Sequence, residues 1–170
     1  MIFRITIWLI MIFGGGILSY YLDTIYFLSI IKNIFFHIIS FAIGLVLLFF
    51  VLRVSKNTGR TLAKYGREGD VSRMDTNKFV NKGIYKYMRH PMHLGLLFFP
   101  LSIALLLGSL SFILIISPAE IIFMLLMIKF VEEPEVKRKF GSDYINYAKQ
   151  TPWFCLKYKC LKLLLSKYYL

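Results

Sequence analysis

Acidic residues and cysteines are scarce in this sequence, and each shortage excludes a kind of protein. Nine Asp and Glu residues stand against 21 Lys and Arg, with three His, so the formal net charge is +12. No group of these residues has the arrangement of a metal site or of a Ser-His-Asp triad, and we predict no metal ligands. The only cysteines, Cys155 and Cys160, form a C-x4-C spacing without a second pair, which matches no zinc pattern.

Apolar residues, in contrast, make up 58% of the 170 residues, and the mean hydropathy is +0.64, too apolar for an ordinary soluble domain. Several apolar runs approach 20 residues and contain almost no charge, which predicts helices inside a bilayer. The basic residues lie between and after these runs rather than in a separate soluble domain. The net charge therefore does not indicate a nucleic-acid partner, and we expect none.

The apolar runs predict about four transmembrane helices. The first two are Ile5–Tyr21 and Ile34–Leu52, and a third run, Leu94–Phe130, is long enough for two crossings at about 1.5 Å per residue. The expected turn of this hairpin is at Gly108-Ser109. A cleaved signal peptide is the alternative interpretation of the first run, but no small-x-small cleavage site follows it, so we expect a retained helix.

Two prolines are expected to modify the hairpin. Its first limb, Leu94–Leu107, is short for about 30 Å of hydrocarbon, so this helix begins before Leu94 or bends at Pro100. Pro118 is expected to kink the second limb. Glu120 follows inside the apolar run, and we interpret it as part of a polar kink, with a direct functional role as the alternative.

The placement of the basic residues predicts the orientation. Ten Lys and Arg lie within Arg53–Arg89 and nine within Lys129–Lys167, while the connections on the opposite side hold only Lys32. The positive-inside rule places both basic segments, and both termini, in the cytosol. We expect an integral, multi-pass protein of the plasma membrane in a prokaryote, or of the endoplasmic reticulum in a eukaryote. In this reducing compartment the two cysteines are expected to stay free thiols.

The expected fold class is all-α: a multi-pass membrane helix bundle of about four transmembrane helices, with a C-terminal helical hairpin and a cytosolic cofactor pocket. We expect one membrane domain, 1–170, whose consecutive parts are two spans (1–52), a cytosolic segment (53–93), the hairpin (94–130) and a cytosolic tail (131–170).

One extension of a span and two further helices are expected outside the membrane core. Residues 53–65 can extend the second span before a loop begins. Residues 130–149 form a helix ended by Pro152, on which three aromatic residues of the tail share a face. Residues 156–170 mix Lys with Leu and Tyr, which is typical of an interfacial helix on anionic lipid.

Two polar clusters flank the hairpin. The first contains Arg89-His90-Pro91, and the second begins with Glu132-Glu133. Because a hairpin returns to the side from which it started, the two clusters are expected to be neighbours. Arg and His can bind a carboxylate, and Glu can bind an ammonium, so together they suit a zwitterionic ligand. Anchoring at the membrane interface is the alternative interpretation.

The order of these motifs resembles a known family. From position 83 the chain reads Gly-x-Tyr-x-x-x-Arg-His-Pro-x-x-x-Gly, and after the hairpin come Glu-Glu, Phe-Gly-x-x-Tyr-x-x-Tyr and Thr-Pro-Trp. This string resembles the isoprenylcysteine carboxyl methyltransferase family, which shares it with the membrane phospholipid N-methyltransferases. The resemblance covers about residues 77–154.

The resemblance implies a membrane enzyme that uses S-adenosylmethionine to methylate a lipophilic substrate from the bilayer. The main expectation is the carboxylate of an isoprenylcysteine or other prenylated substrate, and the alternative is the amine of a phospholipid or another lipid. The implied catalytic residues are Arg89, near the cofactor or substrate carboxylate, and His90. Glu132 is expected to take the amino group of the cofactor, and Glu133 to support the fold. The implied cofactor-binding residues are Phe79, Val80, Tyr85, His90, Pro91, Met92, His93 and Glu132.

Two positions depart from the family pattern and bear on the substrate. His93 stands where the family commonly has Tyr, and Ile128 stands where the carboxyl methyltransferases often have a substrate-binding Arg. A carboxylate is already ionised at neutral pH and needs no base. An amine must lose a proton, which His90, His93 or Glu133 could accept.

Two other classes remain open from the sequence. One is a membrane reductase of the sterol-reductase type with a nicotinamide cofactor, and the other is a non-catalytic membrane module. The expected partners are membrane lipids and a lipophilic substrate, while the oligomeric state and the methyl acceptor are not determined by the sequence.

Overall fold

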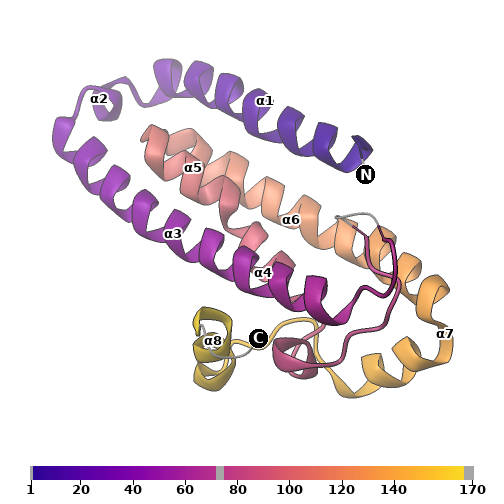
Figure 1. Ribbon diagram of the computed structural model, residues 1–170. Helices are drawn as coiled ribbons and strands as arrows, with labels where there is room; N and C mark the ends of the chain where they lie inside the picture. The colour runs from indigo at the N-terminus through magenta and orange to yellow at the C-terminus, as the bar shows by residue number, and fades with distance from the viewer. Residues whose placement is uncertain (1, 72–74, 167–170) are drawn as a thin grey trace. The chain divides into compact units, whose positions relative to one another are not determined.

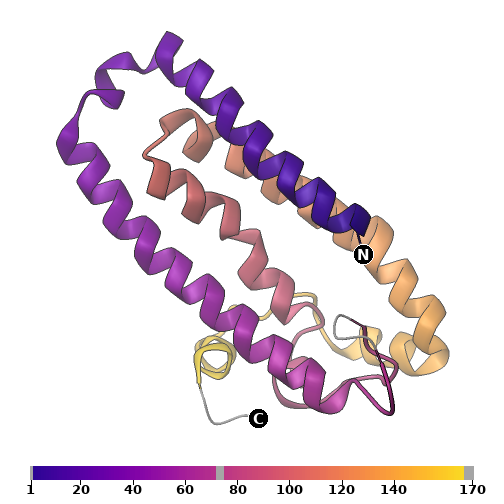
Figure 2. The same ribbon diagram turned by 45° about the horizontal axis from the view of Figure 1, so that its top comes forward.

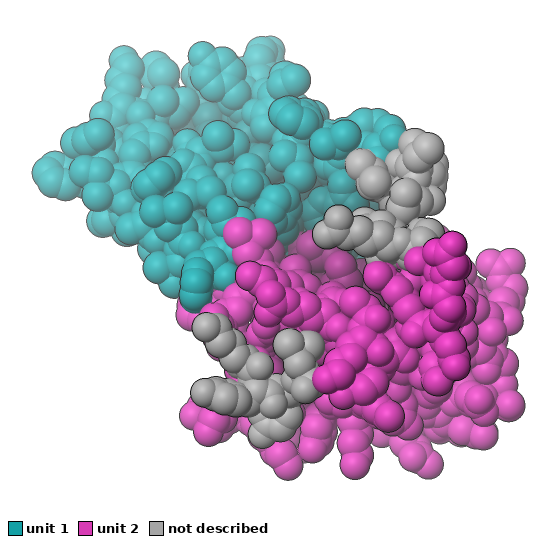
Figure 3. All heavy atoms as spheres, in the orientation of Figure 1, with its two compact units in different colours: residues 1–49, 97–126 teal, residues 50–96, 127–170 magenta. Residues whose placement is uncertain are grey.

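The chain is folded almost entirely into helices. The computed structural model describes residues 2–71 and 75–166, and within these ranges every regular element is helical (Figure 1). This confirms the predicted all-α class. The chain divides into two compact units, one formed by residues 1–49 and 97–126 and the other by residues 50–96 and 127–170 (Figure 3). We call them unit 1 and unit 2.

Unit 1 is an apolar helical assembly. Its elements are α1 (Ile2–Tyr26), α2 (Leu28–Ile31), the first part of α3 (Ile34–Tyr65), α5 (Phe99–Leu107), the π-helical turn η2 (Phe112–Ile116) and most of α6 (Ser117–Met127). Figures 1 and 2 show α1 alongside α6, with α5 between α3 and α6. A small core of Ala104, Phe112 and Ile116 joins α5 to η2.

The outward side chains identify an integral membrane protein. In the described part of the chain three helices are long and apolar enough to cross a bilayer, Thr6–Tyr26, Ile34–Tyr65 and Phe112–Gln150, and a shorter apolar helical stretch covers Pro91–Leu107. The apolar windows of the first two bury only 17% of their residues, and Phe35, for example, is 74% exposed. So much outward apolar surface requires lipid around it.

The hairpin follows the predictions made from its prolines. Its first limb begins early, because α4 (Pro91–Leu97) precedes α5, and the helix is interrupted at Phe98, just before Pro100. Both expected adjustments therefore occur. The turn lies at Gly108, whose φ of 63° suits glycine. The π-helical turn η2 ends directly before Ser117-Pro118, where proline cannot donate its backbone hydrogen bond.

Unit 1 also contains buried carboxylates. The Asp23 carboxylate accepts a hydrogen bond from the backbone N–H of Ser111 at 2.8 Å, which joins α1 to the start of the second limb. Glu120 is buried on α6, where a Cβ on Gly15 would lie 2.9 Å from its Oε1. Glycine at position 15 therefore makes room for the Glu120 side chain, in agreement with the interpretation of a packed polar segment.

Unit 2 carries the polar motifs. Its elements are the last part of α3, the 3-10 helix η1 (Gly83–Lys86), α4, the π-helical turn η3 (Ile128–Glu132), α7 (Glu133–Gln150) and α8 (Tyr158–Leu165). The second span continues as a helix to Tyr65, as predicted. Its end is bound to α8, because Arg53 Nε donates to Leu165 O and Asn57 Nδ2 donates to Leu164 O, each at 2.8 Å.

One prediction about the tail is confirmed with an added kink, and another was wrong. The expected helix over 130–149 is present as η3 and α7, with a kink at Gly141, whose φ of 54° and ψ of −130° are not helical. This backbone conformation is open to glycine because it lacks a Cβ. The expected free thiols are instead a disulfide between Cys155 and Cys160, with Cα atoms 5.9 Å apart. The loop after Trp153 and the first turn of α8 bring the two residues within bonding range, which their spacing alone did not indicate.

The remaining tail predictions fit the observed elements. Pro152 follows the end of α7, as expected. The expected interfacial helix over 156–170 corresponds to α8, and residues 167–170 of that prediction lie outside the described residues. Residues 72–74 of the expected cytosolic segment also lie outside them.

Candidate functional site

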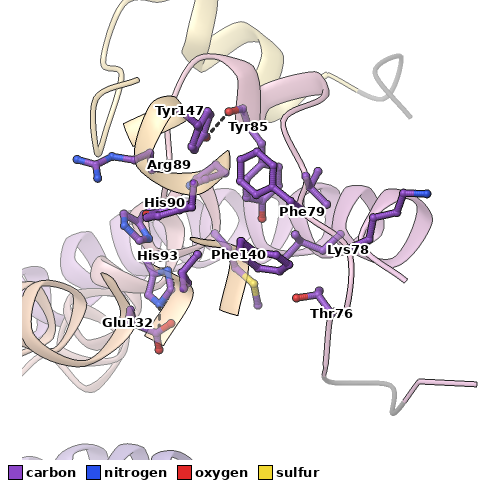
Figure 4. Close-up of a pocket in the computed structure, with 16 residues that line it drawn as sticks. Thr76, Lys78, Phe79, Tyr85, Arg89, His90, His93, Glu132, Phe140 and Tyr147 are labelled. Atoms are coloured by element: carbon purple, nitrogen blue, oxygen red, sulfur yellow. Dashed lines mark hydrogen bonds and ion pairs between the residues drawn. The ribbon is translucent and has the colours of Figure 1, made fainter. Parts of the chain in front are cut away.

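Unit 2 encloses a cavity of about 190 Å³ that brings the two polar clusters together (Figure 4). One part of its wall comes from the segment before α4, the first turn of α4 and the end of α3, and the other comes from η3 and α7. Every residue predicted as a catalytic or cofactor-binding residue lines it: Phe79, Val80, Tyr85, Arg89, His90, Pro91, Met92, His93 and Glu132. The structure therefore shows that these residues lie together around one cavity, whereas their functional roles remain predictions.

Seven lining residues were not among the predicted site residues: Leu62, Thr76, Lys78, Val136, Phe140, Tyr144 and Tyr147. The three aromatic residues belong to the Phe-Gly-x-x-Tyr-x-x-Tyr string, so the sequence did contain a signal for them. Leu62 and Val136 are apolar helical positions without any distinctive pattern, and only the fold identifies them.

An aromatic cluster forms one side of the cavity. The Phe79 ring centre lies 5.7 Å from that of Phe140, 6.1 Å from that of Tyr144 and 5.2 Å from that of Tyr147. The kink at Gly141 stands between the first of these α7 residues and the other two, yet all of them reach the same ring. Such a cluster presents π-electron faces that can attract a cation within about 6 Å.

Backbone hydrogen bonds hold the Arg-His-Pro segment in place. The backbone N–H of Arg89 donates to Pro152 O at 2.9 Å, and that of His90 donates to Trp153 O at 3.1 Å. The Tyr147 hydroxyl donates to Tyr85 O. The Thr-Pro-Trp string, which carries part of the family resemblance, thus fixes the backbone of the Arg-His-Pro motif.

Glu133 binds three side chains at once. Arg89 Nη1 donates to both of its carboxylate oxygens at 2.8 and 2.9 Å, His90 Nε2 lies 2.7 Å from Oε1, and the Tyr144 hydroxyl donates to Oε1 at 2.7 Å. Glu133 itself is only 5% exposed. A buried carboxylate is stable only when such charged and polar partners compensate for its lost hydration. The expectation that Glu133 supports the fold agrees with this geometry.

Arg89 is engaged by the protein as well as bordering the cavity. Its guanidinium forms the ion pair with Glu133 and lies 5.9 Å from the Trp153 ring. In Figure 4 it points away from Phe79 and Phe140. These contacts give Arg89 a clear part in holding Glu133, and its predicted catalytic role remains a prediction.

Glu132, in contrast, lies beside His93 at the cavity. Glu132 Oε1 is 4.0 Å from His93 Nε2, and the two side chains are 20% and 28% exposed. A carboxylate at a partly open wall of a cavity that also contains an aromatic cluster suits an ammonium group on a ligand.

Burial changes the acid–base behaviour of several lining residues, among them His90 and Tyr85. Desolvation lowers the pKa of His90 below its ordinary 6.5, although the neighbouring Glu133 raises it in part. Burial raises the pKa of Tyr85, so its phenol stays protonated at neutral pH. The Tyr85 hydroxyl is buried and has no hydrogen-bond partner among the described residues, so it can serve a polar ligand atom in the cavity.

Comparison with known proteins identifies relatives for most of this region. Residues 33–143 match the phospholipid methyltransferase family. The chain is also 26% identical over 112 residues to a phosphatidylethanolamine N-methyltransferase of Lachancea thermotolerans. That alignment covers 65% of this chain but only 13% of the relative, so the chain spans a small part of that protein's length. No solved structure matches the chain significantly.

Proposed function

Because the chain belongs to the phospholipid methyltransferase family, we propose that it is a membrane methyltransferase that uses S-adenosylmethionine to methylate the amine of a phospholipid headgroup. The observation that carries this proposal is that both polar clusters, which lie within the family match, line the same cavity. The comparisons favour this alternative over carboxyl methylation of an isoprenylcysteine, which the sequence resemblance placed first.

The lining residues fit the parts of the proposed cofactor. Glu132 would bind the ammonium of its methionine portion, and the Tyr85 hydroxyl would meet a polar atom. The rings of Phe79, Phe140 and Tyr147 would lie near a positive sulfonium. S-adenosylmethionine supplies, when bound, a methyl group already activated for displacement. The protein then has to position donor and acceptor in line and to exclude water.

Apolar surroundings favour a lipid acceptor. Large side chains are exposed along α1 and α3, so the protein is embedded in the bilayer from which such a substrate comes. Ile128 is buried and apolar, so it offers no cation to a substrate carboxylate. By the distribution of Lys and Arg, we place the site of transfer on the cytosolic side.

The product distinguishes amine from carboxylate acceptors. Purified protein in phosphatidylethanolamine nanodiscs, incubated with methyl-labelled S-adenosylmethionine, should transfer label to lipid as a base-stable methylamine. Label that mild alkali releases as methanol would indicate a methyl ester and would contradict the proposed acceptor. Addition of a prenylated cysteine to the same nanodiscs should not increase the label.

Glu132→Gln tests the cofactor site. Loss of the charge should weaken S-adenosylmethionine binding, measured by calorimetry, by about tenfold or more, because hydrogen bonds to charged groups contribute about 1.5–3 kcal/mol. Glu135→Gln removes an exposed carboxylate from the first turn of α7, outside the cavity, and should bind as the unchanged protein does. Equal affinity in both variants would remove Glu132 from the proposed site.

A further inference from the structure

The hydrogen bonds of Glu133 determine which ring nitrogen of His90 carries the hydrogen. Its carboxylate receives Arg89 on both oxygens and the Tyr144 hydroxyl on Oε1, and these donors stabilise the ionised form. An ionised carboxylate can only accept hydrogen bonds. The 2.7 Å contact between Glu133 Oε1 and His90 Nε2 therefore requires that Nε2 carries the hydrogen.

The other nitrogen of the ring is then the basic one. Burial keeps the His90 imidazole neutral at physiological pH, so with hydrogen on Nε2 the lone pair is on Nδ1. Nδ1 makes no hydrogen bond within residues 2–71 and 75–166, and the side chain borders the cavity. Edge-to-face contacts with the rings of His93, at 5.4 Å, and Trp153, at 5.9 Å, hold the imidazole plane.

We propose that His90 Nδ1 is the base that removes a proton from the headgroup ammonium of the acceptor lipid, and that Glu133 is the positioning residue that holds the required tautomer. This inference rests on the proposed function, since a carboxylate acceptor would need no base. The two adjacent glutamates then have different roles: Glu132 binds the cofactor, and Glu133 orients His90.

The proton and electrons balance in this step. The ammonium, R–NH3+, gives one proton to Nδ1, and His90 becomes an imidazolium whose Nε2–H still binds the Glu133 carboxylate. The nitrogen lone pair thus freed forms the new N–C bond while the C–S bond breaks, and sulfur keeps the electron pair of that bond. The products are a neutral thioether and a methylated ammonium, and His90 returns its proton to solvent.

The groups around His90 set the expected pH dependence. Glu133 favours the imidazolium, whereas desolvation and the positive charge of Arg89 oppose it. His93 packs against the ring, and Glu132 lies next to His93 at the cavity wall. Because the pKa of His90 is below 6.5, the rate should rise with pH in the acidic range and become constant near neutrality.

The test compares His90→Asn and Glu133→Gln with Asp143→Asn, an exposed carboxylate-to-amide change on the same helix. Each protein, purified whole in phosphatidylethanolamine nanodiscs, is measured for S-adenosylmethionine binding by calorimetry and for methyl transfer from pH 5.5 to 9.5. His90→Asn should lose about 100-fold in kcat at pH 7, within the usual contribution of a general base. Its rate should then increase about tenfold per pH unit, because hydroxide replaces the missing base.

A readout without turnover separates positioning from mere support of the fold. Nitrogen-15 NMR of labelled histidine in the protein without cofactor should show the Nε2–H tautomer for His90, and loss of that preference in Glu133→Gln. The pKa of His90 should also decrease in this variant, because the carboxylate that favours the imidazolium is gone. Should Glu133→Gln fail to fold, Tyr144→Phe removes one hydrogen bond from Glu133 and should produce a smaller change of the same sign.

The outcomes distinguish this inference from the function on which it rests. Wild-type-like pH profiles in His90→Asn and Glu133→Gln, with methylamine still formed, would overturn the base assignment and leave the proposed function intact. Absence of S-adenosylmethionine binding and of methyl transfer in the unchanged protein would overturn both. The inference would be supported if His90→Asn and Glu133→Gln lowered kcat and changed the pH profile of the rate while cofactor affinity stayed nearly unchanged. Asp143→Asn should then behave as the unchanged protein does.

Discussion

Glu132 and Glu133 are adjacent in the sequence but have different surroundings. Successive residues of a helix point about 100° apart, so one side chain borders the cavity near His93 while the other is enclosed by Arg89, His90 and Tyr144. The Glu-Glu pair therefore combines a ligand-facing carboxylate with one that organises the protein. The sequence located the pair, and its expectation that Glu133 supports the fold agrees with the contacts, but the three partners of Glu133 were visible only in the structure.

The titration of His90 should make the protein less stable in mild acid. The pKa of His90 is lower in the folded chain than its ordinary 6.5, so the unfolded chain binds this proton more readily. Between the folded pKa and 6.5 the free energy of unfolding should fall as the pH falls. Thermal unfolding in detergent micelles at pH 7.5 and pH 5.5 measures this loss. His90→Asn should show a smaller pH dependence, and an equal one would contradict the prediction.

Helix α7 is the element that joins the two halves of the site. Glu133 lies in its first turn, Phe140 precedes the break at Gly141, and Tyr144 and Tyr147 follow it. In an unbroken helix, the directions of these three aromatic side chains around the helix axis would be set only by the 3.6 residues per turn. The break changes that relation, so the aromatic cluster around Phe79 depends on one glycine conformation.

Gly141→Ala should therefore destabilise unit 2. A Cβ would meet no neighbouring atom there, but the φ of 54° with a ψ of −130° is a conformation that L-residues rarely adopt. The expected cost is about 1–3 kcal/mol in the free energy of unfolding, together with weaker binding of S-adenosylmethionine. Gly14→Ala is the matched control, since Gly14 is helical and a Cβ there would meet no side chain or other helix within 4 Å, and it should be neutral or slightly stabilising. Equal stability of both variants would show that the kink is not required.

At the scale of the whole molecule, the apolar exterior and the basic segments have separate roles. Exposed Ile, Leu and Phe side chains along α1 and α3 require a lipid environment. Most of the charged residues lie in the segments that build unit 2, where the polar cavity is found. The number of crossings and the orientation remain predictions, because the structure shows which helices are long and apolar enough to cross a bilayer but not which side each end faces.

Reporter fusions can test the predicted orientation in a bacterial host. A green fluorescent protein joined after Leu170 should fluoresce, and alkaline phosphatase at the same position should be inactive, because both results indicate a cytosolic C-terminus. Fusions that replace the chain after Asn33, in the connection that holds only Lys32, should give the reverse pattern. The same reporter pattern at both positions would contradict the assigned topology.

The sequence by itself determined the features that depend on local composition. Continuous apolar runs gave the long helices, proline and glycine gave the interrupted limb and the turn of the hairpin, and ordered motifs located the residues that line the cavity. Each of these follows from backbone chemistry or hydropathy within a short window, which a single sequence contains.

The tertiary structure alone decided which side chains meet. The separation of Glu132 from Glu133, the pairing of the Arg89-His90 backbone with Pro152 and Trp153, and the break in α7 at Gly141 were not apparent from the motifs. The Cys155–Cys160 disulfide contradicted the expectation of free thiols. The partners of Glu133 and the backbone pairing of Arg89 and His90 come from segments distant in the sequence. The disulfide depends on the loop before α8, and the break reflects one of several backbone conformations open to glycine. A local pattern restricts such contacts but does not choose among them, because their free energy depends on partners supplied by other segments.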